Sequence, residues 1–471
     1  ADSHLVQRHE REIFPLLRRR YLFAEVRDFL LYDFYTPEGY VNEDVFAYSN
    51  RAGAERALVV YHNKYAEARG WIRTSVAYSV RAGDGERDLV QKSLGEGLGL
   101  HADDNHFCIF RDDVSGLEFI RNSQELFDTG LYVELGAYKF HVFLDFREVR
   151  DDEWHQYAHL TAYLNGRGVP SIEEALKEVL LQPVHAPFKE LVNAGTFGRL
   201  IDARVTDPDG GLDAHLMDEV EGVTVQLLTE ARQFVGGSGD EAAIAAAIAA
   251  SIAQDIRREL EAVLQLPILE SRFPSPKNPK YKAAVNYLNA DLVDAPAIWG
   301  GILSWLFVHS LGRALDESDF EGQSRSWIDE WLLGKIIAGA LRDLGLDDEA
   351  AWWLVATLKL LTTHQSWFQA RTPGKQEAYR VLETWLRDSE VQSFIQVNRY
   401  QDVLWFNKEA FEQLLWWMLI PAVVTLSADA SRPATEVAGG ITDCYQIIQQ
   451  LLRAGLDSEY QLEKLLAVLE E

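Results

Sequence analysis

The spacing of hydrophobic and polar positions changes twice along the chain and divides it into three zones. Residues 5–31 are mainly helix formers, with apolar side chains at intervals among Arg and Glu, and Pro15 interrupts them. Residues 41–150 carry short runs rich in β-branched and aromatic side chains, which favour strands. Residues 151–471 are almost entirely typical of helices. The pattern predicts an α+β multidomain chain with an N-terminal helix, an antiparallel β-sandwich and then a large all-α helical domain.

The strand zone is clearest near its end. Residues 140–147 alternate between two sets of side chains, as a strand does when one of its faces is buried. We expect strands over residues 45–49, 57–62, 71–80 and 140–147, and a hairpin that pairs residues 106–111 with 116–121. Many short strands at close spacing are typical of an antiparallel sandwich.

Capping and breaking residues divide the helical zone. Ser171 and Glu174 have the spacing of a capping box, and Pro183 is expected to end the helix that begins there. Residues 236–240 read as a glycine-rich joint, and the proline-rich residues 273–279 read as a linker. The predicted segments are a leading helical segment over 1–40, the sandwich over 41–150, a helical subdomain over 151–273 and a helical domain over 280–471.

The net charge of the chain limits the classes of molecule that we expect it to bind. The chain of 471 residues holds 45 basic and 73 acidic side chains, a formal net charge of −28. Nucleic acid and anionic membrane surfaces are bound mainly through Lys and Arg, so we expect neither as a partner. A neutral glucan is compatible with this charge, and so is solubility alone.

The number of cysteines indicates the cellular compartment that we expect for the protein, and the hydropathy indicates whether a segment could span a membrane. The chain has two cysteines, Cys108 and Cys444, in segments assigned to different domains, and no pair has zinc-site spacing. This number excludes a disulfide framework, so we expect a protein of the reduced cytoplasmic compartment. The apolar residues 414–426 are too short to span a bilayer and contain Pro421, so they predict a buried helix.

Three segments of the strand zone carry a family resemblance. Residues 32–51 read YDFYTPEGYVNEDVFAYSNR, residues 55–63 read ERALVVYHN, and residues 140–149 read FHVFLDFREV. Together they resemble the C-terminal part of large bacterial α-amylase-family (glycoside hydrolase family 13) proteins, where the chain leaves the catalytic barrel and enters a C-terminal β-sandwich. The resemblance is best over residues 13–149, under a third of the chain, and the helices after 151 match nothing known to us.

The resemblance implies a family from which the chain would come, but it implies no catalytic activity for the chain itself. The family's catalytic Asp and Glu lie on an α/β barrel, and no Gly-x-Arg-x-Asp segment or terminal His-Asp pair occurs here. We therefore expect no catalytic residue and no cofactor. The first hypothesis is a non-catalytic C-terminal portion of a glycoside hydrolase or transglycosylase acting on α-glucan, with the family's upstream barrel as partner. The alternative is a helical protein-interaction or scaffold module; an independent helical enzyme ranks third.

Aromatic side chains are the candidate carbohydrate contacts, because the apolar face of a sugar ring packs on an aromatic plane. We select Tyr48, Trp71, Trp352 and Trp353. Adjacent residues of a helix point about 100° apart, so one of Trp352 and Trp353 is expected to be exposed. Burial in the core is the more common fate of any single tryptophan.

Polar clusters give weaker signals. The loops at residues 101–106 and 207–213 collect His and Asp side chains, but neither has the spacing of an established site, and we predict no metal. His309 and His364 fall in apolar helices and are expected to be buried histidines with satisfied hydrogen bonds. An active site around them would need carboxylate partners that sequence spacing does not identify.

Overall fold

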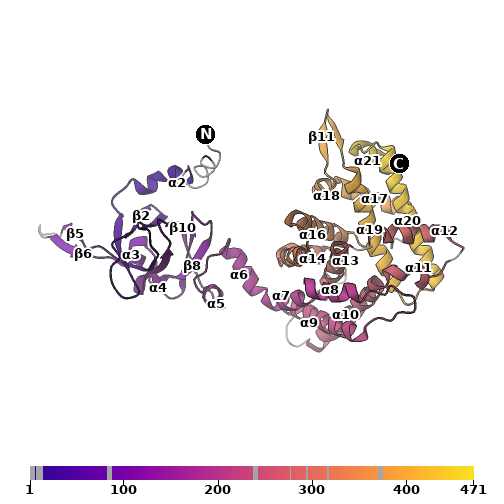
Figure 1. The fold of residues 1–471 in the computed structure, drawn as a ribbon, viewed down its shortest axis with the longest axis horizontal. Helices are drawn as coiled ribbons and strands as arrows, with labels where there is room; N and C mark the ends of the chain where they lie inside the picture. Colours follow the sequence, from indigo (N-terminus) through magenta and orange to yellow (C-terminus); the bar gives the residue numbers. More distant parts are fainter. Residues whose placement is uncertain are drawn as a thin grey trace. The chain divides into compact units, whose positions relative to one another are not determined.

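The chain divides into two compact units, Ala1–Leu180 and Leu181–Glu471. The structure is a computed structural model that describes residues 6, 14–81, 87–236, 242–275, 277–292, 295–315, 318–369 and 375–470. The protein is mixed α/β, 56% helix and 18% strand, and its long sheet falls wholly within the first unit (Figure 1).

The first unit is built on one curled, antiparallel sheet of eight strands in the order β8-β7-β10-β3-β2-β1-β4-β9. The strands are β1 Leu30–Tyr35, β2 Val45–Ala52, β3 Glu55–His62, β4 Ala68–Ser75, β7 His106–Asp112, β8 Glu118–Asn122, β9 Leu131–Leu135 and β10 Phe140–Arg150. A separate two-stranded ribbon pairs β5 Tyr78–Arg81 with β6 Arg87–Val90. Short helices α3 Leu94–Leu98, α4 Ser123–Asp128, α5 Gln156–Leu164 and α6 Ile172–Leu180 complete the unit.

Most expected strands are confirmed. Residues 45–49, 57–62 and 140–147 lie within β2, β3 and β10, and β7 pairs with β8 as the predicted hairpin. The expectation of one strand over 71–80 was wrong, because β4 ends at Ser75 and β5 begins at Tyr78. The helix predicted to reach residue 31 gives way to strand at Leu30.

The pattern predicted a β-sandwich, whereas the structure has a single curled sheet over these residues. The pairing of β10 accounts for this difference. Its residues Phe140–Phe143 pair with β3, and the residues from Phe143 to Arg150 pair with β7. The register shifts between Leu144 and Arg147, where Asp145 has a φ of 53°. A bulge bends its strand and increases the local twist, so one long strand joins both halves of the sheet.

The two faces of the sheet bury different sets of side chains. Tyr32, Phe34 and Val60 belong to the cluster inside the curl. On the outer face, Leu22 is 1% exposed and packs against Val59. Leu22 comes from the turn η2 Arg20–Phe23, which follows α2 Phe14–Arg18, so this described part of the leading segment packs on the sheet. Residues 1–5 and 7–13 lie outside the described residues.

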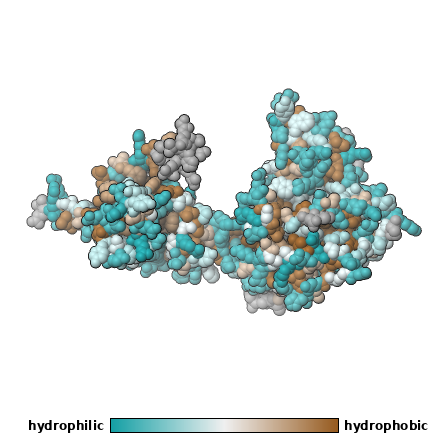
Figure 2. Space-filling model, in the orientation of Figure 1, coloured by the Kyte–Doolittle hydropathy of each residue, from teal (hydrophilic) through white to brown (hydrophobic). Residues whose placement is uncertain are grey.

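Among the residues that the structure describes in the second unit, one hairpin of strands occurs besides the helices, β11 Asn398–Tyr400 with β12 Val403–Trp405. Its helices are α7 Gln182–Leu191, α8 Ala194–Asp202, α9 Ala214–Phe234, α10 Ala242–Leu264, α11 Leu269–Arg272, α12 Pro279–Asn289, α13 Pro296–Val308, α14 Phe320–Glu330, α15 Leu333–Asp343, α16 Asp348–Thr363, α17 Lys375–Arg387, α18 Ser389–Phe394, α19 Lys408–Ala428, α20 Ala434–Asp457 and α21 Leu462–Glu470; the 3-10 turns are η4 Leu266–Ile268 and η5 Leu311–Ala314. The hairpin projects from the unit, and its visible tip is hydrophilic (Figures 1 and 2).

The helix-breaking residues identified in the sequence mostly lie at the ends of helices or between them. The helix α6 ends at Leu180, and Pro183 lies at the start of α7, where its missing amide proton costs little. Ser171 Oγ accepts the Glu174 amide proton at 3.3 Å. Helix is absent between α11 and α12 within the described part of the proline-rich linker, while most of the predicted glycine-rich joint, residues 237–240, lies outside the described residues.

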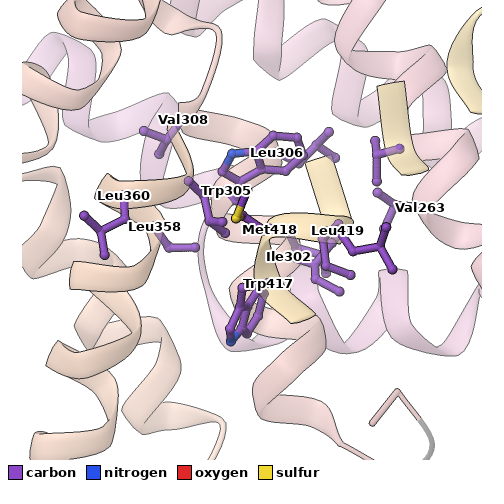
Figure 3. Packing of buried hydrophobic residues seen from close by; sticks show 14 of the residues in the cluster. Val263, Ile302, Trp305, Leu306, Val308, Leu358, Leu360, Trp417, Met418 and Leu419 are labelled. Carbon is purple, nitrogen blue, oxygen red and sulfur yellow. The ribbon is translucent and has the colours of Figure 1, made fainter. Parts of the chain in front are cut away.

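Two helices that are apolar all round form the centre of the second unit. Figure 3 shows Trp305 and Ile302 of α13 beside Met418 and Leu419 of α19. Among the described residues, α19 alone is long and apolar enough to cross a membrane by length and composition, and 83% of its apolar window is buried within the protein. The sequence estimate of its length was wrong, because Pro421 lies inside the helix without ending it.

Candidate functional site

Three aromatic side chains lie in one row on the outer face of β1, β4 and β9. Tyr35 of β1 is directly opposite Trp71 of β4, and Trp71 is directly opposite Tyr132 of β9. Residues opposite one another in an antiparallel pair point to the same side of the sheet. Their neighbours Phe34 and Ile72 are 0% exposed and point into the curl, so the row faces outward. We call Tyr35, Trp71 and Tyr132 the aromatic row.

The row is accessible and its rings are in contact. Trp71 and Tyr132 have ring centroids 4.9 Å apart with planes inclined by 60°, and Tyr132 is 39% exposed. The Arg73 guanidinium lies 5.1 Å from the centre of the Trp71 ring, which favours a cation–π contact. Tyr35 and Trp71 are half-buried. The surface therefore offers aromatic area together with a fixed positive charge beside it.

Polar groups border the row at the edge of the sheet. Tyr132 Oη donates a hydrogen bond to Glu134 Oε1 at 2.8 Å, and this bond raises the pKa of the tyrosine. Arg69 of β4 is opposite Glu134 in the register, so charges of both signs stand side by side. A row of this kind can stack on the apolar face of a sugar while its border exchanges hydrogen bonds with hydroxyl groups.

Gly70 permits the close approach of β4 to β1 beside the row. A Cβ atom built on Gly70 would lie 2.1 Å from the backbone oxygen of Tyr35 and 2.9 Å from the Phe34 ring. Backbone atoms cannot yield as a flexible side chain can, so any larger residue would push the two strands apart. The alignment of Tyr35 with Trp71 depends on this glycine.

Tyr48 shares the outer face but is covered from above. Its ring lies 6.5 Å from that of Phe23, edge to face, and 5.7 Å from that of Phe29. Burial raises the pKa of its hydroxyl. The described part of the leading segment thus reduces the surface that Tyr48 can offer to a ligand. Among the aromatic contacts of the described residues, Trp71 contacts Tyr132 and no ring of the leading segment.

Trp352 and Trp353 lie on α16 of the second unit. Trp352 is 45% exposed, while Trp353 is half-buried and stacks on Phe394 with centroids 4.4 Å apart. The expectation that one of the two is exposed is confirmed. Trp71 is on the sheet of the first unit, so the four selected side chains do not form one site on either unit.

Side chains of the two polar loops form hydrogen bonds within the first loop, to β10 and to the start of α9. His101 Nδ1 lies 3.1 Å from Glu148 Oε2, and His106 Nδ1 lies 3.2 Å from Asp103 Oδ2. In the second loop, Asp213 accepts the amide protons that begin α9. Among the described residues, no group of three or more His, Cys, Asp or Glu side chains is arranged to hold a metal ion.

The two histidines of the helical unit differ in their surroundings. His309 is 4% exposed and contacts Glu259 of α10, a carboxylate fifty positions earlier that sequence spacing did not identify. His364 lies against the Trp385 ring at 5.1 Å, and burial lowers its pKa to about 4.

Tyr35 and Tyr132 of the aromatic row were not among the side chains selected from the sequence as carbohydrate contacts. The alternation of residues 30–35 and 131–135 is the signal that would have placed both on strands.

Comparisons with known proteins add no identification. No protein-family model, curated protein or solved structure matches the chain.

Proposed function

We propose that the first unit is the non-catalytic C-terminal β-domain of an α-amylase-family protein, and that it contacts α-glucan through the aromatic row. Its partner is the catalytic barrel of the same protein. The local resemblance of residues 13–149 supports the family, and the aromatic row is the single observation that supports the glucan contact.

The chemistry of the surface favours an uncharged polysaccharide over a charged one. The net charge of −28 repels polyanions, and Arg69 opposite Glu134 leaves both signs at the border of the row. Three outward aromatic side chains in register give a strip that extends across three strands. Strands lie about 4.8 Å apart, so the row is long enough to meet more than one sugar ring of a chain.

The experiment is calorimetric titration of the full chain with maltohexaose, using cellohexaose as a ligand of the same composition and different linkage. Trp71→Ala is expected to weaken maltohexaose binding roughly fivefold, because one stacked aromatic contributes on the order of 1 kcal/mol beyond its area. Trp154→Ala is the matched control, because Trp154 is 74% exposed and lies in a turn outside the sheet.

Two outcomes would overturn the proposal. One is equal maltohexaose affinity for Trp71→Ala and Trp154→Ala. The other is a preference for cellohexaose in the unmutated chain. For the partner, we expect the reading frame that leads into the Ala1 codon to encode a barrel with Gly-x-Arg-x-Asp and a Glu acid, and a frame without these would remove the family assignment.

A further inference from the structure

Two histidine side chains hold the place where the chain passes from β9 into β10. Residues 136–139 join these strands, which are consecutive in the chain but separated by β3, β2, β1 and β4 in the strand order. Because β9 is the last strand in that order, β4 is its one pairing partner among the described strands. Side chains that reach β9 from other strands therefore add contacts that strand pairing does not supply.

His141 of β10 contacts two acceptors at once. Its Nδ1 lies 3.0 Å from Asp112 Oδ2 on β7, and its Nε2 lies 3.4 Å from the backbone oxygen of Glu134 on β9. A neutral imidazole has one N–H group and one lone pair, whereas an imidazolium has two N–H groups. A neutral ring would turn its lone pair toward either the carboxylate or the carbonyl oxygen. The two contacts together therefore match the imidazolium.

The Asp112 carboxylate is bonded as an ionised group. Its side chain is 1% exposed, and it accepts the Ser115 hydroxyl at 2.7 Å. It also accepts the backbone amide protons of Val114, Ser115 and Val142 at 3.2–3.3 Å. Burial alone would raise the pKa of Asp112, but the hydrogen bonds from His141 and Ser115 lower it. A negative charge is thus held within the protein, and His141 is the side chain that balances it.

The groups around the His141 ring come from several strands. On β10 itself, Phe143 stacks on the ring with centroids 5.4 Å apart, and on β3 the residue opposite in the register is the apolar Val60. On β9, the Glu134 carboxylate accepts a hydrogen bond from the tyrosine of the aromatic row on the same strand. Burial alone would lower the pKa of His141, but Asp112 and the Glu134 backbone oxygen outweigh it and raise the pKa.

His62 of β3 contacts the same connection in a different way. Its Nδ1 lies 3.1 Å from the backbone oxygen of Gly136, and the residue is 1% exposed. One N–H group is enough for this one acceptor, so a neutral His62 keeps its bond. Of the two histidines, His141 is the one that must give up a bond when its ring loses a proton.

We propose that His141 is a pH-sensitive clasp on β9. As an imidazolium it bonds β7 and β9 at the same time, and as a neutral ring it keeps the stronger bond to the carboxylate and releases the Glu134 oxygen. Because the pKa of His141 is raised in the folded chain, the clasp is closed below the ordinary value of 6.5 and opens as the pH rises through the folded-state value.

The clasp acts on the strand that carries Tyr132 of the aromatic row. Tyr132 lies two residues before Glu134 and donates to its carboxylate at 2.8 Å, so release of β9 holds Tyr132 less firmly beside Trp71. This consequence rests on the proposed glucan contact. Maltohexaose is expected to bind the full chain more weakly above the pH at which His141 loses its proton.

Histidine-selective nitrogen NMR of the full chain tests the protonation. The chain holds 12 histidines, and the signal that is absent from His141→Asn identifies this ring. At pH 7, an ordinary histidine with a pKa of about 6.5 is roughly three-quarters neutral, whereas we expect His141 to carry protons mainly on both ring nitrogens. A ring that is mainly neutral at pH 7 would overturn the proposal, and this result needs no variant to fold.

Hydrogen exchange of the peptide that covers β9 and residues 136–139 tests the clasp itself. An Asn amide nitrogen takes roughly the place of Nδ1, so His141→Asn keeps a donor for Asp112 and removes the donor for Glu134. At pH 6 we expect exchange at least about threefold faster in His141→Asn than in the parent, for one weak hydrogen bond. The two rates should become equal above the pH at which His141 loses its proton. His62→Asn is the matched control and should show the pH dependence of the parent.

The outcomes separate the clasp from the glucan contact. A ratio of exchange rates between His141→Asn and the parent that stays constant across the titration of His141 would overturn the clasp. Loss of the parent's pH dependence in His62→Asn would overturn it as well. Equal maltohexaose affinity on both sides of that titration would overturn the effect on the aromatic row. If maltohexaose binds at neither pH, the proposed glucan contact fails, and the NMR and exchange results still decide the clasp.

Discussion

Replacing Glu118 by Gln tests how the helices after the sheet are attached to it. The Glu118 carboxylate is 5% exposed and accepts two hydrogen bonds from Arg147, at 2.9 and 3.2 Å, and one from Arg111 at 3.3 Å. It also accepts the backbone amide proton of Ile172 at 2.8 Å, at the start of α6. A negative charge at a helix N-terminus is stabilised by the helix dipole, so one side chain joins β8, β10 and α6.

The size of the effect follows from the pKa of this carboxyl. Burial alone would raise the pKa of Glu118, but Arg147, the Ile172 amide and Arg111 outweigh it and hold the pKa at about 2. A shift of this size corresponds to roughly 3 kcal/mol as an upper limit. Both arginine side chains are nearly half exposed, at 47% and 45%, so solvent screening reduces the expected loss in Glu118→Gln to about 1–2 kcal/mol.

The direction of the pH dependence is set by the lowered pKa. The stabilisation is complete above the ordinary glutamate pKa of 4.5 and is lost as the pH falls toward the folded-state value of about 2. The difference between Glu118→Gln and the parent should therefore be largest near neutral pH and should shrink below pH 4.5.

Hydrogen exchange of the peptide that contains Ile172 is the measurement. At neutral pH we expect exchange about tenfold faster in Glu118→Gln, in proportion to the lost free energy. Glu173→Gln is the control on the same helix, because Glu173 is 80% exposed and lies 3.7 Å from Lys177. Equal exchange in the two variants, or a Glu118→Gln effect that stays constant from pH 7 to pH 3.5, would refute the reasoning.

Two further predictions concern the helical unit. The low pKa of His364, about 4, means that its stabilising effect is present above pH 6.5 and is lost as the pH falls to 4, so His364→Gln should reduce the acid sensitivity of that unit by roughly 1–2 kcal/mol in urea titrations. Trp353→Ala should lower the free energy of unfolding by about 2 kcal/mol, because its stacked ring leaves a cavity, while Trp352→Ala should change it by less than about 0.5 kcal/mol. Equal losses in the two tryptophan variants would contradict the orientation of α16.

Local patterns predicted strands better than they predicted how strands assemble. The alternation of residues 140–147 identifies a strand correctly, because a period of two follows directly from the backbone. The same alternation does not reveal that β10 pairs on both edges and bends at Asp145. Pairing partners are set by contacts between distant residues, and a single sequence does not display these contacts.

In the candidate sites too, the sequence identified individual residues but not the distant residues that they contact. Trp71 was selected from its residue type alone, but Tyr35 and Tyr132 join it through register across three strands. His309 was expected to be a satisfied buried histidine, and the structure supplies hydrogen-bond partners on both ring nitrogens. Glu259 lies on another helix, so no local spacing could have named it.

The central place of β10 has a consequence for how the protein is made. It is the last strand of its sheet to leave the ribosome, yet it joins β7 and β8 to the other strands. Until about residue 150 has emerged, β3 and β7 each present an open edge to other nascent chains. Translation that pauses or stops shortly before Phe140 would prolong this exposure, so synthesis rate across residues 136–150 should control how much of the protein reaches its native form.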